Sequence, residues 1–363
     1  MSPLQVRHHA LLLPAFLPDA TFGYVRSLTS ADLYEAGVHG LMMNAFHLMQ
    51  KPGSTVIQTM GGLQRFSGWD GLIMTDSGGF QAYSLIRQNP KFGSLNENGI
   101  IIRPEGSTRK LILTPEKSIQ LQFSYGADVL FCLDDCTHVD APFEEQQLSV
   151  QRTIAWANRC KDTYEKQLTA RQISSEDRPL LFAVIQGGGY PELRKRCAES
   201  LLEIGFDGFG FGGWPLDDQS QLLTDILAYT RELVPNHYQL HALGIGHPLN
   251  VFTCYHLGYT LFDCALPTRD ARHGRLYALS AAGEVPNAGS DWFRYLYIGD
   301  DEYMRKAQPI SPGCDCPTCQ HYSLAYLNHL YRMKDASYSR LASQHNLRFM
   351  TQLMESLRNA SKD

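Results

Sequence analysis

Short apolar segments recur along the chain, and most are bounded by glycine, proline, aspartate or asparagine. Runs of this length between turn-forming residues are typical of buried β-strands. Most of them are separated by stretches in which apolar residues recur with the period of an α-helix. The segments predicted as strands are Leu11–Phe16, Gly40–Met43, Leu72–Thr75, Asp128–Leu133, Leu180–Ile185, Gly208–Phe211, Ala242–Ile245 and Thr260–Phe262.

The stretch Pro191–Ile204 illustrates the helical pattern between these strands. Its proline suits the first turn of a helix. One face carries four apolar residues: Leu193, Cys197, Leu201 and Ile204. Strands that alternate with helices indicate an α/β fold, and eight of them favour a (β/α)₈ TIM barrel. An open, doubly wound parallel sheet is the alternative.

The first interruption of this alternation lies within residues 92–113. Two β-like runs, Gly99–Arg103 and Lys110–Leu113, flank a turn at Glu105-Gly106-Ser107 and predict an inserted β-hairpin. Thr114 and Pro115 then suit the N-cap and the first turn of the next helix.

A second insertion covers residues 276–346, after the last predicted strand, and carries a cysteine cluster. The sequence therefore predicts one barrel domain over residues 1–363, with a subdomain at residues 276–346. Cys314, Cys316 and Cys319, completed by His345, form a C-x-C-x-x-C array with an imidazole. Three thiolates and one imidazole make a closed tetrahedral Zn²⁺ site with a structural role. His321 and His329 are rival fourth ligands, and three free thiols are the alternative to a metal site.

Composition adds limits to this picture. The chain has 363 residues, of which 44% are hydrophobic and 19% charged, as in an ordinary globular protein. Its net charge of −5 argues against broad nonspecific binding of nucleic acid but permits a local basic patch. The apolar run near the N-terminus is broken by Pro14 and Pro18, so we expect no signal peptide and no membrane span. The cysteines then indicate a reducing, cytoplasmic environment.

Polar residues and glycines follow the predicted strands, where a barrel builds its active site. Asp76, Asp134 and Asp263 come at three strand ends and could divide the roles of nucleophile, general acid/base and reader of a substrate N–H. A helix cap or an ion pair is the alternative for each. Asp135 adjoins Asp134, and we expect it to face the opposite side. The glycine runs in DSGGFQ, IQGGGY and FGFGGW suit close approach of a planar heterocycle, or form ordinary turns.

Three arginines follow Asp263 at three-residue intervals: Arg269, Arg272 and Arg275. Guanidinium groups bind phosphates and base edges, so an acid followed by arginines suggests chemistry on a nucleic acid. The alternative is an ion pair between Asp263 and one of these arginines. An ion-paired Asp263 would be a poor nucleophile, so we expect Arg269 and Arg272 to point away from it.

With these residues in view, the chain resembles the tRNA-guanine transglycosylase family in its bacterial and eukaryotic queuine-type branch. The resemblance extends from Pro14 to Arg348. It is carried by DSGGFQ, a strand that ends in DDC, IQGG, GFGFGG, LGIG, FDCALPTRDAR, and CDCPTC followed by HNLR. It implies a barrel with a zinc-bearing insertion. It also implies exchange of the guanine at the wobble position, 34, of certain tRNAs for a 7-deazaguanine.

The resemblance implies a role for each matching residue. Asp263 is the implied nucleophile at C1′ of the ribose, and Asp76 the implied general acid/base. The implied base pocket comprises Ser77, Phe80, Asp134, Cys136, Gln186, Gly212, Gly213, Trp214, Leu243 and Gly244, with Phe80 and Leu243 stacking on the base. Arg269, Arg272 and Arg275 are implied to hold the anticodon loop, and Cys314, Cys316, Cys319 and His345 to bind zinc.

One loop departs from the family pattern. Trp214-Pro215-Leu216 replaces an aliphatic and then a small residue after the glycine pair. Proline has no N–H, so we expect the Trp214 carbonyl to face the ligand and to favour a 7-substituent that bears an amine. Leu216 and Cys136 suggest a small pocket and hence the aminomethyl base, while queuine stays open.

Two other functions compete with this interpretation. A noncatalytic tRNA-binding subunit of a heteromeric transglycosylase would be expected to lose Asp263 or Asp76, and both are present. A barrel hydrolase of free nucleosides would leave the arginines and the cysteine cluster without a purpose. The expected assembly is a homodimer, or a heterodimer with a paralogue.

Overall fold

Eight parallel strands form a barrel in this computed structural model, which describes residues 3–103, 110–138, 140–280 and 292–360. They are β3 (Ala15–Pro18), β4 (Gly40–Asn44), β5 (Leu72–Asp76), β9 (Val129–Phe131), β10 (Leu180–Ile185), β11 (Gly208–Phe211), β12 (Gln239–Ala242) and β13 (Leu261–Cys264). Their order around the sheet is β3-β13-β12-β11-β10-β9-β5-β4. Parallel pairing of Asp19 with Met42 closes the gap between β3 and β4. The predicted barrel is confirmed, and the open sheet is excluded.

Two predicted strands differ from the structure by more than two residues at an end. The segment predicted at Ala242–Ile245 begins earlier, as β12, because Gln239 and His241 lie on the strand although their polarity hides the pattern. The segment predicted at Leu11–Phe16 is divided at Leu12–Pro14. Its first part belongs to the antiparallel pair β1 (Leu4–Val6) and β2 (His9–Leu11), and its second part is β3. Proline cannot donate to a sheet ladder, which explains the break.

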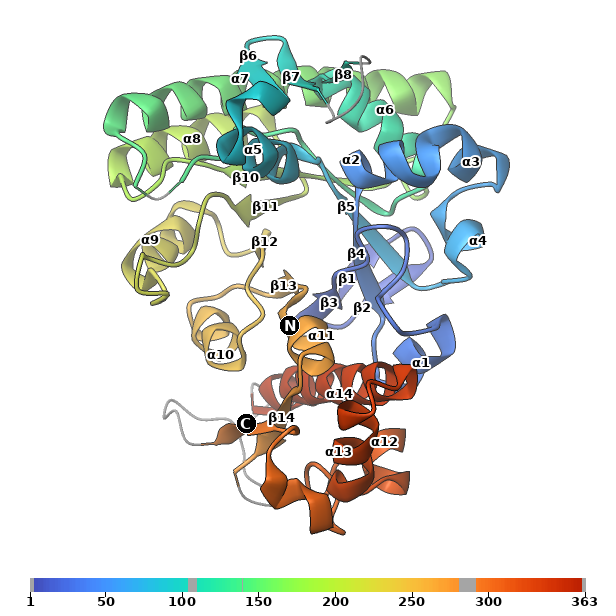
Figure 1. Cartoon of the computed structure of the whole chain (residues 1–363). Helices are drawn as coiled ribbons and strands as arrows, with labels where there is room; N and C mark the ends of the chain where they lie inside the picture. Colours follow the sequence, from blue (N-terminus) through green and yellow to red (C-terminus); the bar gives the residue numbers. More distant parts are fainter. Residues whose placement is uncertain (1–2, 104–109, 139, 281–291, 361–363) are drawn as a thin grey trace.

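Helices surround the strands, with α7 and α8 on one side of the barrel in Figure 1 and the C-terminal helix on the opposite side. Those before the C-terminal region are α1 (Ser30–Glu35), α2 (Ala45–Leu48), η1 (Met49–Gly53), α3 (Ser54–Thr59), α4 (Leu63–Ser67), α5 (Gly79–Gln88), η2 (Pro90–Phe92), α6 (Pro115–Tyr125), α7 (Phe143–Ala170), α8 (Pro191–Ile204), α9 (Thr224–Leu233), α10 (Pro248–His256) and α11 (Leu266–Arg272). Thr114 caps α6 by accepting the Lys117 N–H, as expected. Leu193, Cys197 and Leu201 of α8 are buried, also as expected.

The predicted hairpin is part of a larger unit. It is a three-stranded antiparallel sheet of β6 (Gly93–Asn96), β7 (Gly99–Ile102) and β8 (Leu111–Leu113). Sequence patterning missed β6, whose alternate residues are exposed. The predicted turn at Glu105-Gly106-Ser107 lies outside the described residues.

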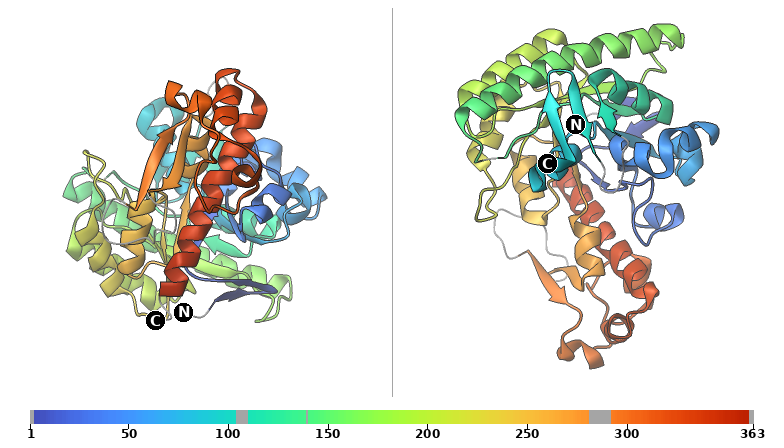
Figure 2. Two further views of the ribbon diagram at one scale, coloured as in Figure 1. Left: turned by 90° about the horizontal axis from the view of Figure 1, so that it is seen from below. Right: turned by 45° about the horizontal axis from the view of Figure 1, so that its top comes forward.

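A C-terminal unit follows α11. It consists of β14 (Arg275–Leu279), β15 (Phe293–Tyr297), η3 (Asp301–Arg305), α12 (Pro317–His321), α13 (Leu324–Arg332) and the first turns of α14 (Ala336–Ala360). Figure 2 shows α14 running from this unit along the barrel. There it packs on α11, α1 and β3, in the place of the eighth barrel helix. Because α14 is continuous across residue 346, the division into a barrel and a subdomain at residues 276–346 stays a prediction. None of the described helices is long and apolar enough to cross a membrane.

Candidate active site and metal centre

A cavity of about 540 Å³ opens at the carboxyl ends of the barrel strands. Every residue predicted for catalysis or base binding lines it: Asp76, Ser77, Phe80, Asp134, Cys136, Gln186, Gly212, Gly213, Trp214, Leu243, Gly244 and Asp263. These residues are far apart in the sequence. The parallel strands bring them together because each lies in or just after a strand that ends at this face.

Asp263 lies on β13 at the wall of the cavity. Its Oδ1 atom is 2.8 Å from Nε2 of His241, on the neighbouring strand β12, and accepts the Gly244 N–H at 3.1 Å. His241 is fully buried. Among the described residues, the carboxyl group of Asp263 contacts the His241 ring and forms an ion pair with no arginine. The alternative of a structural pair with the following arginines is therefore excluded.

Asp76 ends β5 in a different environment. Asn44 donates its side-chain N–H to Oδ2 at 2.8 Å, and the Gly78 N–H donates to Oδ1 at 3.1 Å. Burial raises the pKa of Asp76 to about 8, with a further contribution from the negative charges of Asp263 and Asp19. Asp76 thus holds a proton at neutral pH and can deliver it.

Asp134 lies deeper, after β9. Gln186 donates to its Oδ2 at 2.6 Å, and the Ser77 hydroxyl lies 3.4 Å from its Oδ1. Burial raises the pKa of Asp134 to about 6, against the effect of these two hydrogen bonds. At pH 7 it is therefore mostly ionised and can accept N–H groups from a ligand. Asp135 faces the other way, as expected, and pairs with Arg152 on α7.

The mouth of the cavity is aromatic. The rings of Phe80 and Trp214 lie 5.7 Å apart, and the two side chains are 40% and 42% exposed. The glycines after β11 keep the interior open. A Cβ on Gly212 would lie 2.5 Å from the Gln186 amide nitrogen, and Gly213 has φ +90°. These features leave room for a flat ring next to Gln186 and Asp134.

The three predicted arginines separate in the structure. Arg269 and Arg272, on α11, line a second cavity of about 220 Å³ together with Tyr24 and Arg26. Arg275 begins β14, lies 3.6 Å from Asp270 and stacks over Tyr295 at 5.0 Å. It lines neither cavity.

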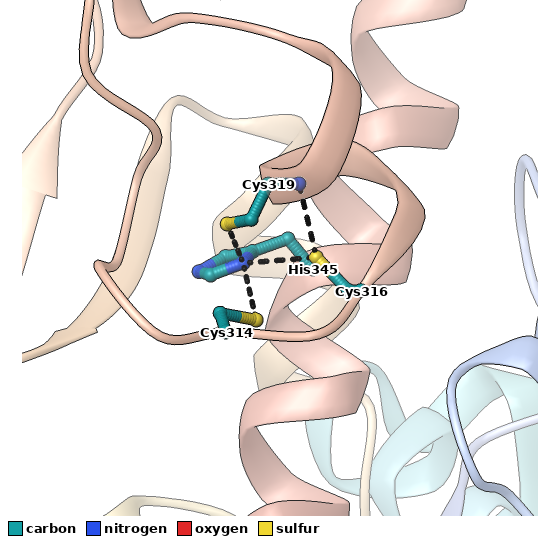
Figure 3. Close-up of side chains that lie close together, drawn as sticks. All are labelled: Cys314, Cys316, Cys319 and His345. Carbon is teal, nitrogen blue, oxygen red and sulfur yellow. Dashed lines mark hydrogen bonds between the residues drawn. The ribbon is translucent and has the colours of Figure 1, made fainter. Parts of the chain in front are cut away.

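Cys314, Cys316, Cys319 and His345 form a buried cluster in the C-terminal unit (Figure 3). Nδ1 of His345 lies 3.8, 3.5 and 3.3 Å from the three sulfurs in turn. These values surround the ~3.5 Å expected between nitrogen and sulfur ligands of one tetrahedral zinc ion. Nε2 of His345 lies 2.6 Å from the Tyr277 carbonyl oxygen, a contact that orients the ring. The cluster can therefore bind a metal ion, and its histidine is His345 and neither His321 nor His329.

The model of the family described as TGT, queuine tRNA-ribosyltransferase, matches residues 1–363. The chain belongs to this family. A queuine tRNA-ribosyltransferase of Psychrobacter cryohalolentis is 35% identical over 98% of this chain and 88% of its own length. Proteins of the same name from Lysinibacillus sphaericus and Halothermothrix orenii are 36% and 34% identical, over 97% and 100% of this chain and 86% and 90% of their own lengths.

Membership of the queuine tRNA-ribosyltransferase family confirms the resemblance that the motifs indicated. The protein is an enzyme, a pentosyltransferase that carries out guanine transglycosylation of tRNA in queuosine modification. The family fold is also confirmed, because the barrel and the Cys₃His cluster are both present.

Sequence reasoning missed Arg194, a fully buried arginine beneath the base pocket of this transglycosylase. It donates to the backbone carbonyls of Ile185, Gly188 and Gly212 at 2.7, 2.9 and 2.9 Å. It also stacks 4.1 Å from the centre of the Phe211 ring. A signal was available, because position 194 falls on the inner face of α8 with Cys197 and Leu201. His241 was missed as well, because its strand was placed too late.

We expect that replacing Arg194 weakens base binding. Arg194→Leu would leave three buried carbonyls without a donor, at about 1–3 kcal/mol each, and loosen both glycine loops. The KM for guanine should rise about tenfold or more. The matched control is Arg196→Leu on the exposed face of α8, which should leave KM unchanged. An unchanged KM in folded Arg194→Leu protein would contradict this positioning role.

The cluster predicts metal dependence of stability. The purified protein should contain about one zinc ion per chain, and Cys319→Ser should lose it because a closed site needs all four ligands. Elemental analysis and thermal unfolding would measure the loss and the lower midpoint. Cys254→Ser, at a buried cysteine outside the cluster, should keep the metal. Full zinc content in Cys319→Ser would exclude this ligand set.

Proposed function

We propose that this enzyme exchanges the wobble guanine through a covalent bond between Asp263 and the ribose. The observation that carries the proposal is the difference between two carboxylates in one cavity. Asp76 is protonated at neutral pH, whereas Asp263 is held by His241 and Gly244. A protonated carboxyl group beside a second one that is fixed by hydrogen bonds suits an acid and a nucleophile in glycosidic bond cleavage.

The first step follows from the hydrogen bonds to Asp263. In the described part of the chain both of them end on Oδ1, so we assign the attack on C1′ to Oδ2. Asp76 gives its proton to the departing guanine as the C1′–N9 bond breaks. The new ester keeps the tRNA on the enzyme while guanine leaves. Asp76 then takes a proton from the incoming 7-deazaguanine, whose N9 attacks C1′ and releases Asp263.

Base recognition is assigned to the inner wall of the cavity. The ionised Asp134 accepts the N–H groups that guanine and 7-deazaguanines share, and Gln186 fixes its orientation. Phe80 and Leu243 stack on the ring. Because the target nucleotide is already in a loop, extruding its base costs at most a few kcal/mol.

The loop after β11 is assigned to the choice of 7-substituent. The Pro215 carbonyl accepts the Leu223 N–H at 3.0 Å, and Leu216 pairs with Leu222, so this loop is pinned to the following chain. Proline offers no N–H to a ligand. The Trp214 carbonyl then selects an amine donor, and Leu216 and Cys136 leave room for the aminomethyl base.

Other parts of the proposal concern partners. Arg269 and Arg272 hold the anticodon loop through their shared cavity, and Arg275 makes an outer tRNA contact. The Cys₃His cluster holds a structural zinc ion.

The enzyme acts in the cytoplasm as a homodimer, or as a heterodimer with a paralogue. The presence of both Asp76 and Asp263 disfavours a noncatalytic subunit, which would show no exchange on its own.

The covalent step is tested by trapping. Wild-type protein should exchange radiolabelled guanine into tRNA and form an adduct that survives denaturing electrophoresis. Asp263→Ala should lose both because no carboxylate remains to capture C1′. Asp76→Asn should slow adduct formation at least about a hundredfold, as expected for loss of a general acid. Exchange by Asp263→Ala would refute the mechanism.

Wild-type adduct formation should also depend on pH. Since the pKa of Asp76 is raised to about 8, the acid form is present below that pH and is lost above it. The single-turnover rate should therefore fall as pH rises through about 8. A single-turnover rate that stays constant well above this pH would show that Asp76 does not donate the proton.

Base choice is tested by competition between aminomethyl- and nitrile-substituted 7-deazaguanines, with queuine as a third base. The kcat/KM for the aminomethyl base should be at least about tenfold higher than that for the nitrile base, which is the effect expected from one added hydrogen bond. Pro215→Ala restores a backbone N–H at position 215, so the ratio of kcat/KM between the aminomethyl and nitrile bases should become smaller. Equal kcat/KM values for the two bases in the wild type would refute the assignment of Trp214.

A further inference from the structure

A fourth carboxylate, Asp19, lies at the active face and has no part in the mechanism above. It comes directly after β3 and pairs with Met42 of β4 where the barrel closes. It lines the base cavity together with Asp76 and Asp263, and it also lines the smaller cavity of Arg26, Arg269 and Arg272.

Asp19 forms the boundary between these two spaces. The cavities share three lining residues, which are Asp19, Ala265 and Arg269. A nucleotide attached at Asp263 connects to the rest of its RNA through its sugar and phosphates. If the flanking phosphates bind the arginines of the small cavity, the sugar between them and the base passes Asp19.

The surroundings of Asp19 indicate what it can bind. The Thr21 hydroxyl donates to its Oδ1, and burial raises the pKa of the carboxyl, with a smaller contribution from Asp263. Three arginines line the small cavity, and the charge of Arg26 lowers the pKa of Asp19 slightly, but among the described residues none of the three forms an ion pair with it. A carboxylate repels a phosphate but accepts a hydrogen bond from a hydroxyl. In an internal nucleotide O3′ and O5′ are esterified, so the 2′-hydroxyl is the only hydroxyl of the sugar.

We propose that Asp19 accepts a hydrogen bond from the ribose 2′-hydroxyl of the nucleotide whose sugar lies between the two cavities. The contact makes the enzyme select RNA over DNA at that nucleotide. This inference rests on the proposed function because it takes Asp263 as the attachment point. A 2′-deoxy sugar leaves a largely buried carboxylate without its ligand donor, and the penalty falls on binding and positioning of the RNA.

Singly substituted anticodon stem-loops test the proposal. One loop is all-ribose, and three others carry one 2′-deoxy sugar at the exchanged guanosine, at the preceding nucleotide or at the following nucleotide. For the wild type, one of the three substitutions should lower kcat/KM for guanine exchange about ten- to a hundredfold, the range of a charge-assisted hydrogen bond. The Asp19→Leu variant should have almost the same kcat/KM on the 2′-deoxy loop that slows the wild type as on the all-ribose loop.

Two further variants sharpen the comparison. Asp19→Asn keeps the shape and a neutral acceptor, so it should retain part of the discrimination. Asp162→Asn, on the exposed face of α7, makes the same exchange away from both cavities and should discriminate like the wild type. Unchanged discrimination in both Asp19 variants would overturn the proposal, as would equal activity of wild type on all four loops.

Binding separates this proposal from the proposed function. The same four loops can be titrated against Asp263→Ala protein and against an Asp263→Ala, Asp19→Leu double variant. A 2′-deoxy penalty in Kd that disappears with Asp19 supports the contact even if the exchange chemistry fails. Absence of any 2′-deoxy penalty in Kd and in kcat/KM, with normal exchange on the all-ribose loop, refutes the contact and leaves the proposed function intact.

Discussion

The common direction of the eight barrel strands is the constraint on which the site depends. Because all strands are parallel and the barrel closes between β3 and β4, every carboxyl end opens on the same face. Asp76 and Asp263 lie at or next to the last residue of their strands, and Asp19 and Asp134 follow theirs. Four carboxyl groups thus gather around two adjoining cavities, although the sequence separates the first and last by most of the barrel.

Carboxyl groups that gather in this way repel one another when they are charged, and each of the four has its own hydrogen-bond partners. Asp134 keeps its charge through Gln186 and Ser77, and Asp263 is held by His241 and a backbone N–H. Burial raises the pKa of Asp76 to about 8, above that of Asp134 at about 6, so Asp76 carries the proton. Its raised pKa means that folded protein binds this proton more tightly than unfolded protein, so the contribution of Asp76 to stability declines as pH rises from about 4 to about 8. The same burial that makes Asp76 a useful acid therefore lowers the stability of the fold at neutral pH.

The sequence predicted whatever depends on neighbours along the chain. The Thr114 cap, the inner face of α8 and the cysteine spacing are local patterns, and the structure confirms them. It could not predict contacts made only by folding. His241 looks like a polar interruption until β13 places Asp263 next to it. The position of Arg194 on the inner face of α8 indicates burial, but its three carbonyl partners come from loops that only the fold brings together. In the sequence Asp19 follows a proline and resembles a turn residue. Only the closure of the barrel shows that it adjoins both cavities.

The metal cluster and the catalytic face are connected through α14. His345 faces the three sulfurs with one ring nitrogen and contacts the Tyr277 carbonyl oxygen with the other. The Tyr277 hydroxyl in turn donates to Asp270, on α11 between Arg269 and Arg272. Asn346, the next residue on α14, donates to the Pro267 carbonyl at the start of α11 and accepts the Tyr277 N–H. Helix α11, which carries Arg269 and Arg272, is therefore held in place through His345 of the metal cluster and through its neighbour Asn346. A metal ion bound by this cluster would fix the orientation of α11. It would thereby position the arginines beside Asp19 without contacting the RNA.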